Sequence, residues 1–328
     1  MIGMEKQFLG ESAALLVFLN DEEVTDILIN GIHSVFVEKQ GQLHYHPSPF
    51  QTTAAIWDLI ERLVIPLGRR IDATQPYLDG RLGDGSRFHV ILPPIALGGP
   101  FLSFRRFRKR ASLNLSETAP LGTIDWLQEQ LRRKKSLLIA GGTGTGKTTL
   151  LSVLLDGVSP AERMILIEDT AEITTLHPHV IRLETRPPTP EGNGEVSARS
   201  LVRNALRMRP DRLILGECRS EEAFDLLQAM HTGHPGSLCT IHANSALDAL
   251  RRFESLVLLC GYSLPLRHVR EWIASAVSIV VHLEKEGGVR RISEIIQVEG
   301  LEGDVYRISP RYSRQRNLTL KWSALGAS

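Results

Sequence analysis

The stretch GGTGTGKTT, from Gly141 to Thr149, constrains the fold of this chain more than any other feature. It lies between the apolar run SLLIA and the helix-like run TTLLSVLLDG, which is the setting of a phosphate-binding loop. Its glycines allow successive backbone N–H groups to point inward at a phosphate, and the following helix adds the positive end of its dipole. The stretch therefore predicts a strand, a loop that binds the phosphates of a nucleotide, and a helix.

The same motif assigns roles to its residues. Lys147 is expected to reach the β- and γ-phosphates, and the Thr148 hydroxyl to complete the coordination of a Mg²⁺ ion, so ATP and Mg²⁺ are the expected ligands. A glycine-rich turn with an incidental lysine is the alternative, and the full GxxxxGKT spacing with its flanking runs speaks against it. The residues expected to bind the nucleotide are Gly142, Thr143, Gly144, Thr145, Gly146, Lys147, Thr148 and Thr149.

After residue 118 the sequence alternates helical stretches with short apolar runs. These runs are SLLIA, MILIED, HVIRLE, RLILGE and LCTIHA. Continuous apolar runs flanked by helices are typical of strands buried on both faces of a mainly parallel sheet. The stretch SIVVHLEKEGGVRRISEIIQVEG predicts an antiparallel hairpin that closes the edge of this sheet. We therefore expect an α/β domain over 119–328.

Residues 1–108 follow a different pattern and predict a smaller α+β domain. Alternating stretches such as SVFVEKQGQLHYH indicate strands, with Gly41 in a hairpin turn. AAIWDLIERLVIPLG repeats apolar residues at helical spacing and ends at Pro66 and Gly68. The polar, basic segment 109–118 is expected to link the two domains.

Phosphoryl transfer also needs an acidic residue for Mg²⁺ and a residue that orients the attacking water. MILIEDT ends with Glu168 and Asp169, and RLILGE ends with Glu217, so both runs place acids at the carboxyl ends of predicted strands. We predict Glu217 as a Mg²⁺ ligand together with Thr148, in the manner of a Walker B acid, and Glu168 as a second catalytic acid. Which of the two glutamates orients the water stays open.

The stretch HTGHPGSLCTIHANS contains His231, His234, Cys239 and His242, whose spacing invites a zinc site. Cys239 and His242 lie three residues apart on one predicted strand and point to opposite faces, so four ligands do not converge. His242 ends that strand and is expected to face the same crevice as Glu217 and the γ-phosphate. His234 lies in a glycine-rich loop and is expected to move with this phosphate sensor, whereas we expect a structural role for His231.

Composition argues against several classes of protein. The 38 Lys and Arg residues and 37 Asp and Glu residues leave a net charge of +1, so no overall basic field attracts nucleic acid or anionic lipid. The three cysteines form no CxxC pair, which argues against a structural zinc site or a disulfide framework. No signal peptide pattern is found, and no uncharged apolar run approaches the roughly 18 residues that cross a bilayer. We expect a cytoplasmic protein with only peripheral membrane association.

Four stretches, in this order along the chain, closely resemble the traffic ATPases of type II and type IV secretion and of pilus assembly. They are GGTGTGKTT, ILIEDTAEI, RPPTPEGNGEVSARSLVRNALRMRPDRLILGECRS and TGHPGSLCTIHANS. The resemblance extends to DILINGIHSVFVEKQGQL, LDGRLGDGSRFHVILPP and LSFRRF, so it covers most of the chain. Within this group the sequence looks most like the ATPases of tight-adherence (Flp) pilus assembly, the CpaF type.

The resemblance implies a RecA-like ATPase domain, preceded by a PAS-like N-terminal domain that rotates relative to it, in a homo-hexameric ring. It implies a motor that works with an inner-membrane platform protein at the cytosolic face of the membrane and binds no nucleic acid directly. Carried over by position, it assigns Glu168 to an acidic box, Glu217 to the Walker B position, and His234 and His242 to a histidine box.

The resemblance also places Arg87, in DGSRFH, and Arg105, in SFRRF, where arginines of the family's N-terminal domain approach the phosphates. A planar guanidinium suits a γ-phosphate better than an ammonium group does, and a well-placed arginine can raise the rate about 10³- to 10⁵-fold. ATP hydrolysis would then depend on closure of the two domains.

The sequence departs from the family pattern at Cys218, where an aliphatic residue is usual, and at His231, where asparagine is common. It also lacks the long N-terminal extension of many pilus-type relatives. A short N-terminal region is usual in type IV secretion traffic ATPases, which are the alternative assignment. Two further alternatives are a RecA-like nucleic-acid motor, against which the near-neutral charge speaks, and a scaffold that binds ATP without turnover.

Overall fold

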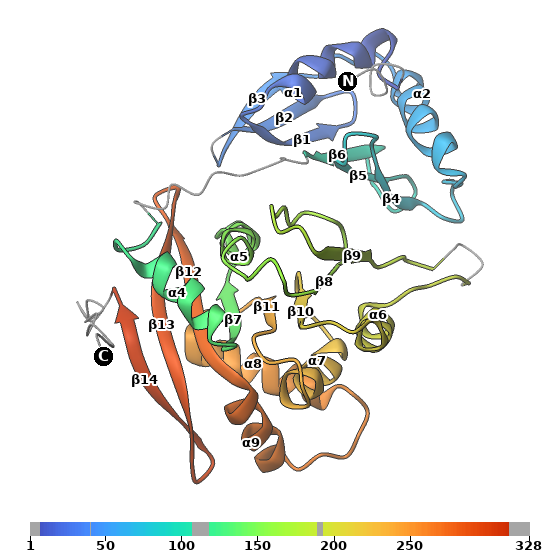
Figure 1. Cartoon of the computed structure of the whole chain (residues 1–328). Coiled ribbons are helices and arrows are strands. Elements are labelled where there is room, and N and C mark those ends of the chain that lie inside the picture. The colour runs from blue at the N-terminus through green and yellow to red at the C-terminus, as the bar shows by residue number, and fades with distance from the viewer. Residues whose placement is uncertain (1–6, 40, 107–117, 189–192, 315–328) are drawn as a thin grey trace. The chain divides into compact units, whose positions relative to one another are not determined.

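The computed structural model describes residues 7–39, 41–106, 118–188 and 193–314. The chain divides into two compact units, Met1–Lys109 and Arg110–Ser328. In Figure 1 the elements of the first unit are blue to blue-green, and those of the second run from green to red. The predicted linker over 109–118 lies outside the described residues except for Thr118. Within the described residues, no helix has the length and apolar character that crossing a membrane requires.

The first unit contains a six-stranded antiparallel sheet in the order β3-β2-β1-β6-β5-β4. Its helix α2 buries one apolar face against this sheet, which agrees with the predicted α+β class. Short helices precede the first strand. The elements are η1 (Gly10–Leu15), α1 (Leu16–Asn20), β1 (Val24–Asn30), β2 (Ser34–Lys39), β3 (Gln42–Pro47), α2 (Thr53–Val64), η2 (Ile65–Leu67), β4 (Tyr77–Arg81), β5 (Arg87–Ile91) and β6 (Phe101–Arg105).

Local signals in the sequence set the limits of α2. The Thr52 hydroxyl accepts a hydrogen bond from the Ala55 N–H at 3.3 Å and so caps the first turn. Apolar residues at helical spacing face the core, and the chain leaves the helix through η2 at Gly68, whose φ is +63°. Strand β4 was not predicted, because its sequence YLDGR has no clear apolar alternation.

The second unit is an α/β domain with an eight-stranded sheet in the order β14-β13-β12-β7-β11-β10-β8-β9. The strands from β12 to β9 in this order are parallel, whereas β13 and β14 are antiparallel. The strands are β7 (Ser136–Gly141), β8 (Met164–Glu168), β9 (Val180–Glu184), β10 (Arg212–Leu215), β11 (Leu238–Ile241), β12 (Val277–Glu286), β13 (Val289–Glu302) and β14 (Val305–Ser313).

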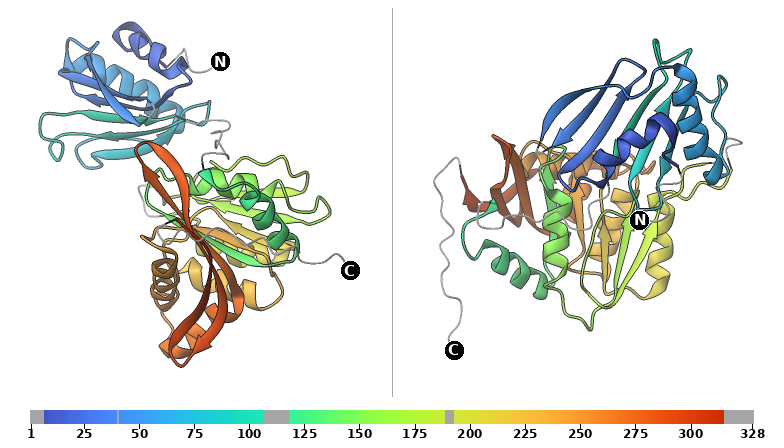
Figure 2. Two further views of the ribbon diagram at one scale, coloured as in Figure 1. Left: turned by 90° about the vertical axis from the view of Figure 1, so that its left-hand side faces the viewer. Right: turned by 90° about the horizontal axis from the view of Figure 1, so that it is seen from above.

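Helices cover both faces of this sheet, as Figures 1 and 2 show. One hydrophobic cluster joins the sheet to α4 and α5, and a second joins the opposite face to α6, α7, α8 and α9. This double cover explains why the predicted strands are continuously apolar. The helices are α4 (Thr123–Arg132), α5 (Lys147–Leu155), α6 (Ala198–Ala205), η3 (Leu206–Met208), α7 (Glu222–His231), α8 (Ala246–Leu258) and α9 (Leu266–Ala276).

The predicted antiparallel hairpin is confirmed as β12 and β13, but its predicted place at the sheet edge is wrong. A further strand, β14, pairs with β13 and forms that edge. The sequence of β14, VYRISPRYS, is mostly polar, and only Tyr306 and Ser313 of this strand are buried, so it lacks the apolar pattern that the other strands show.

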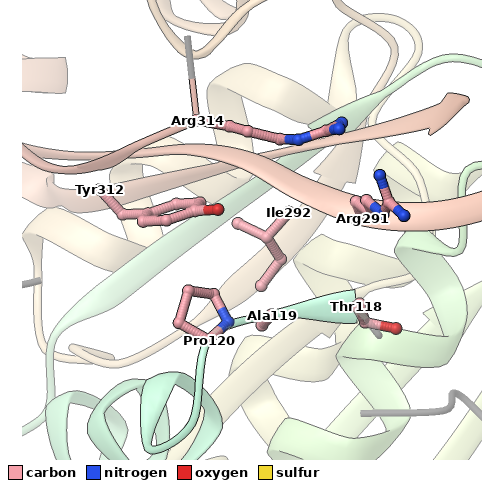
Figure 3. A pocket seen from close by; sticks show the side chains of 7 residues that line it. All are labelled: Thr118, Ala119, Pro120, Arg291, Ile292, Tyr312 and Arg314. Atoms are coloured by element: carbon pink, nitrogen blue, oxygen red, sulfur yellow. The ribbon is translucent and has the colours of Figure 1, made fainter. Parts of the chain in front are cut away.

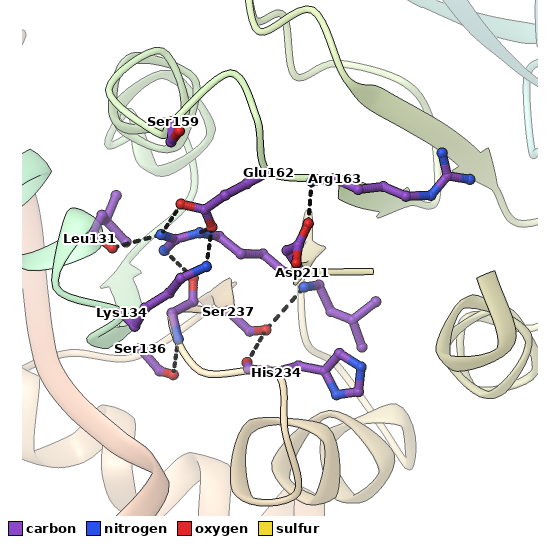
Figure 4. A network of polar contacts seen from close by, with 12 residues as sticks. Leu131, Lys134, Ser136, Ser159, Glu162, Arg163, Asp211, His234 and Ser237 are labelled. Atoms are coloured by element: carbon purple, nitrogen blue, oxygen red, sulfur yellow. Dashed lines mark hydrogen bonds and ion pairs between the residues drawn. The ribbon is translucent and has the colours of Figure 1, made fainter. Parts of the chain in front are cut away.

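The end of the sheet opposite the phosphate loop is held by a buried ionic network around Arg212 (Figure 4). Arg212 is fully buried, and its Nε and Nη2 donate to the two carboxylate oxygens of Glu162 at 2.6 and 3.0 Å. It also donates to the backbone oxygens of Leu131 and Gly236 at 2.7 and 3.0 Å, and Lys134 pairs with Glu162. The network compensates the buried charge and joins α4 to the loops that precede β8 and β11.

Candidate nucleotide-binding site

The phosphate loop connects β7 to α5, which confirms the predicted strand, loop and helix. Gly141 has a φ of +153°, and a Cβ atom there would lie 2.5 Å from the Leu283 oxygen and 2.6 Å from Thr145 Oγ1. The Thr145 hydroxyl donates to the Gly142 oxygen at 3.0 Å, and Gly146 precedes the helix with a φ of +96°. The conformation of the loop therefore requires glycine at its first position.

Two basic side chains contact the backbone of the loop. Lys147 is buried, and its Nζ donates to the oxygens of Gly141 at 3.0 Å and Gly142 at 2.7 Å. Burial lowers the pKa of Lys147, and the nearby Glu217 carboxylate opposes this effect. Arg290, at the start of β13, donates from Nε to the Gly144 oxygen at 3.1 Å. Arg290 was not predicted, since it lies far from the loop in sequence.

Glu217 follows β10 and accepts a bidentate pair of hydrogen bonds from Arg219. The Nε and Nη2 atoms of Arg219 lie 2.6 and 2.9 Å from Oε1 and Oε2 of Glu217. Burial alone would raise the pKa of Glu217, but the Arg219 hydrogen bonds and the charges of Arg219, His242 and Lys147 outweigh it and lower the pKa. Glu217 is therefore a carboxylate at neutral pH.

His242 directly follows β11, and its Nε2 lies 3.2 Å from Oε1 of Glu217. Burial and the charge of Lys147 lower the pKa of His242, although Glu217 opposes them. The ring is therefore mainly neutral at pH 7, and its Nε2 lies next to the ionised carboxylate of Glu217. The structure therefore brings His242 and Glu217 together near Lys147, and their predicted roles at the γ-phosphate stay predictions.

Arg219 also connects two acids of neighbouring strands. Its Nη1 donates to Oδ2 of Asp169, the residue after β8, at 3.0 Å. Arg219 was missed by the sequence analysis, although the motif GECRS places it two residues after Glu217. The short distance in sequence between Arg219 and Glu217 could have indicated their contact. The contact between Arg219 and Asp169 could not be predicted in this way, because it depends on the order of the strands.

Glu168 ends β8 and is only 5% exposed. Its Oε1 accepts hydrogen bonds from the backbone N–H groups of Glu172 and Ile173, both at 2.8 Å, and Arg182 lies 3.4 Å from Oε2. Burial raises the pKa of Glu168, although these hydrogen bonds oppose the rise. In this conformation Glu168 stabilises the loop that follows β8, and its predicted catalytic role stays a prediction.

The order of the strands decides which side chain lies nearest to the loop. Strand β11 is the neighbour of β7, followed by β10 and then β8. Since neighbouring strands lie about 4.8 Å apart, His242 comes first, Glu217 second, and Glu168 is the most distant of the three.

His234 lies at the other end of β11, before the strand begins. Its N–H donates to the Ala229 oxygen at 3.1 Å, and its own oxygen accepts from the Ser237 hydroxyl at 2.8 Å, close to the Arg212 network in Figure 4. The whole of strand β11 separates His234 from His242, and the predicted role of His234 in phosphate sensing stays a prediction. His231 ends α7, and its ring stacks on Trp272.

Arg87 and Arg105 belong to the first unit, where they lie directly opposite each other on β5 and β6. Arg87 is the first residue of β5 and Arg105 is the last residue of β6, so the two arginines are neighbours in the sheet although they lie far apart in the sequence. Their predicted approach to the phosphates stays a prediction.

Most of the chain is similar to known proteins. The family model described as "Type II/IV secretion system protein" matches residues 10–290. A Mycobacterium tuberculosis protein named for conjugal transfer, Rv3659c, is 39% identical over 303 residues, which span 89% of this chain and 85% of the relative. The conjugal transfer protein TrbB of Rhizobium radiobacter is 33% identical over 300 residues, which span 89% of each chain.

Solved structures share the fold. The pilus retraction motor PilT with bound ADP has a TM-score of 0.63 at 20% identity, and the match covers 92% of this chain and 84% of that chain. The Legionella pneumophila ATPase DotB has a TM-score of 0.62 at 22% identity, with 86% and 79% covered.

The sequence relatives are conjugal transfer proteins, so the comparisons do not support the narrower placement with tight-adherence pilus ATPases. They do support the broader resemblance to proteins of type II and type IV secretion. The chain belongs to the family of type II/IV secretion system proteins.

Proposed function

We propose that this chain is a Mg²⁺-dependent ATPase that serves as the traffic ATPase of a type IV secretion or conjugal transfer system. The observation that carries the proposal is the convergence of Lys147, Glu217 and His242 beside the phosphate loop. The similarity to TrbB supports conjugal transfer over the tight-adherence assignment that the sequence analysis favoured.

The chemistry of the site follows from these side chains. The backbone N–H groups of the loop and Lys147 bind the β- and γ-phosphates, and the hydroxyl of Thr148 and the carboxylate of Glu217 are oxygen ligands of the kind that Mg²⁺ prefers. A bound Mg²⁺ would neutralise charge on the phosphates. Arg219 donates to both oxygens of Glu217, and the remaining lone pairs of this carboxylate would hold the metal. The ring of His242 lies 3.2 Å from the same carboxylate.

The same proposal includes a larger assembly. It comprises a homo-hexameric ring in which hydrolysis drives rotation of the first unit against the second, with Arg87 and Arg105 completing the site. The ring would act on an inner-membrane platform protein from the cytosolic side. Its support is the family membership, and the mass of the particle in solution, with and without ATP, tests the ring.

Steady-state phosphate release from Mg²⁺-ATP tests the proposed activity. Lys147→Ala should lower turnover by about 10²- to 10³-fold, the usual effect of removing one group that stabilises developing charge. Lys135→Ala is the matched control, because Lys135 is exposed and lies before β7. Equal phosphate release by wild type and Lys147→Ala would rule out hydrolysis at this loop. Stimulation by DNA, falling steeply with salt, would favour the nucleic-acid motor.

A further inference from the structure

A buried histidine on β12, His282, contacts the chain directly after His242. His282 is 4% exposed. Its Nε2 lies 3.3 Å from the backbone oxygen of Ala243, and its Nδ1 lies 2.7 Å from the hydroxyl oxygen of Ser293, closer than the Glu284 carboxylate at 3.7 Å. Because the Ala243 oxygen can only accept, Nε2 carries the hydrogen and donates to it. In the neutral ring the Ser293 hydroxyl donates to Nδ1 and fixes the orientation of the ring.

The contact between His282 and Ala243 crosses the strand that leads into the phosphate loop. Strand β7 lies between β12 and β11 in the sheet. His282 is paired with Ala140 of β7, the residue before Gly141. Ala140 belongs to the same hydrophobic cluster as Val280, two residues before His282, so the two paired residues share a face of the sheet. The small side chain of Ala140 therefore leaves room for the histidine ring to reach the segment after β11.

An irregularity in the pairing of β12 with β13 places Ser293 against this ring. His282 is paired with Glu294. The next residue of β12, Leu283, is paired with Ile292, so Ser293 is an extra residue on β13. Such a β-bulge re-aims a side chain. Ile292 packs into the cluster on the α4 and α5 face and lines a pocket of about 350 Å³ there, as Figure 3 shows. Strand β13 is therefore anchored on one face of the sheet while Ser293 supports the ring of His282.

The residue paired with His282 holds the other end of the same segment. The carboxylate of Glu294 accepts a hydrogen bond from the N–H of Ala246, the first residue of α8, at 3.1 Å. Residues 243–245 connect His242 to α8, and the β12–β13 hairpin thus binds this connection at both of its ends. The backbone next to His242 is therefore fixed by two side chains of the hairpin as well as by β11.

The ring of His242 depends on this backbone for its position. Its side chain is 44% exposed and lies 3.2 Å from Glu217. An exposed side chain keeps much of its rotamer freedom, because few neighbours restrict it. A fixed backbone limits the directions in which the ring can point, whereas a free one would let the ring leave Glu217.

We propose that His282 is a positioning residue of the nucleotide site. By donating to the Ala243 oxygen, it keeps the segment after β11 in the conformation that places the His242 ring beside Glu217. The inference rests on the proposed ATPase function and adds to it a support from the β12–β13 hairpin. In this role His282 itself touches neither nucleotide nor metal.

Steady-state phosphate release and NMR spectra of the histidine rings, recorded on the full chain without nucleotide, test the proposal. His282→Leu fills the space but cannot donate. Its kcat should fall about 10- to 100-fold with an unchanged KM for ATP, as when a catalytic group is misplaced by about an ångström. The ring signal of His242, identified by its loss in His242→Gln, should shift. His282→Gln keeps an N–H donor and should restore kcat and the His242 signal.

His177→Leu is the matched control. His177 is a buried histidine of the same unit, and its Nε2 donates to the backbone oxygen of Ser159 at 2.8 Å. Its replacement removes a comparable hydrogen bond outside the segment 243–245. We expect wild-type kcat and an unchanged His242 signal.

The outcomes separate this proposal from the proposed function. An unchanged kcat or an unchanged His242 signal in His282→Leu overturns it, and so does a loss of kcat that His282→Gln does not restore. If His282→Leu does not fold, Ser293→Ala, which removes the group that orients the ring, replaces it in both measurements and under the same criteria. If the wild type releases no phosphate, the proposed function fails, and the His242 signal alone decides whether His282 holds this segment.

Discussion

Glu217 is the residue on which the charged groups of the site converge. Arg219 binds both of its oxygens, and His242 contacts one of them. In water such exposed pairs contribute little, but here the carboxylate is partly buried, and the arginine keeps it ionised. The carboxylate of Glu217 is therefore negatively charged and lies near Lys147, where it can bind a cation.

Glu168→Gln tests the role of the second acid. The folded protein binds a proton at Glu168 more readily than the unfolded chain, because burial raises its pKa. Ionisation of Glu168 therefore costs stability as pH rises through the folded pKa, and a neutral glutamine should leave the protein as stable as wild type at pH 7, or more stable. Its amide oxygen can still accept from Glu172 and Ile173. We expect normal ATP binding and loss of phosphate release.

Two measurements check this expectation. Thermal unfolding at pH 7 reports on the fold, and single-turnover phosphate release reports on the chemical step. Near-normal release by Glu168→Gln would transfer the water-orienting role to Glu217, which a parallel Glu217→Gln variant would show. Glu168→Ala is a further control: it leaves the buried N–H group of Ile173 unpaired and should lose about 1–3 kcal/mol of stability, with a smaller loss from the part-buried N–H group of Glu172.

At the scale of elements, the junction of β7 and the phosphate loop leaves no room for a side chain at Gly141. Gly141→Ala places a methyl group 2.5 Å from the Leu283 oxygen, so the loop or β12 must shift. We expect a loss of about 1–3 kcal/mol in the free energy of unfolding, as for other overpacked sites, and loss of ATP binding. Urea unfolding and nucleotide titration measure the two effects.

Gly144→Ala is the matched control for this substitution. Gly144 also has a positive φ, +72°, but a Cβ atom there meets nothing within 4 Å. Only the backbone strain of about 1–2 kcal/mol remains. If Gly144→Ala lowers the free energy of unfolding as much as Gly141→Ala, steric contact with β12 is not the reason for the loss of stability.

The elements differ in how well the sequence predicted them. Strands buried on both faces, such as β7 and β8, were found because continuous apolar runs have no other common explanation. Strands β4 and β14 were missed, because an exposed strand needs no apolar pattern and is held by backbone hydrogen bonds to its neighbour.

At the scale of the whole molecule, the proposed coupling between the two units predicts a role for Arg87 and Arg105. If they stabilise the transferred phosphate, Arg87→Gln and Arg105→Gln should each lower turnover by about 10³- to 10⁵-fold. ADP and pyrophosphate should bind as in wild type, since the phosphate loop belongs to the second unit. Phosphate release and calorimetry measure the two properties.

Arg70→Gln is the control in the same unit, because the side chain of Arg70 is 85% exposed and contacts Asp72. Unchanged turnover in both Arg87→Gln and Arg105→Gln would show that the first unit contributes no arginine to hydrolysis. The coupling would then have to act through binding or assembly.

Local sequence patterns were enough to predict the phosphate loop, its flanking strand and helix, and the acids at strand ends, because each of these is a pattern of consecutive residues. Which of these residues meet could be learned from the folded domain alone. The fold placed His242 and Glu217 near Lys147, put His234 at the opposite end of β11, and brought Arg290 to the loop from residues distant in sequence. The physical reason is that strand order and side-chain contacts across strands depend on the packing of the entire domain, which no local pattern contains.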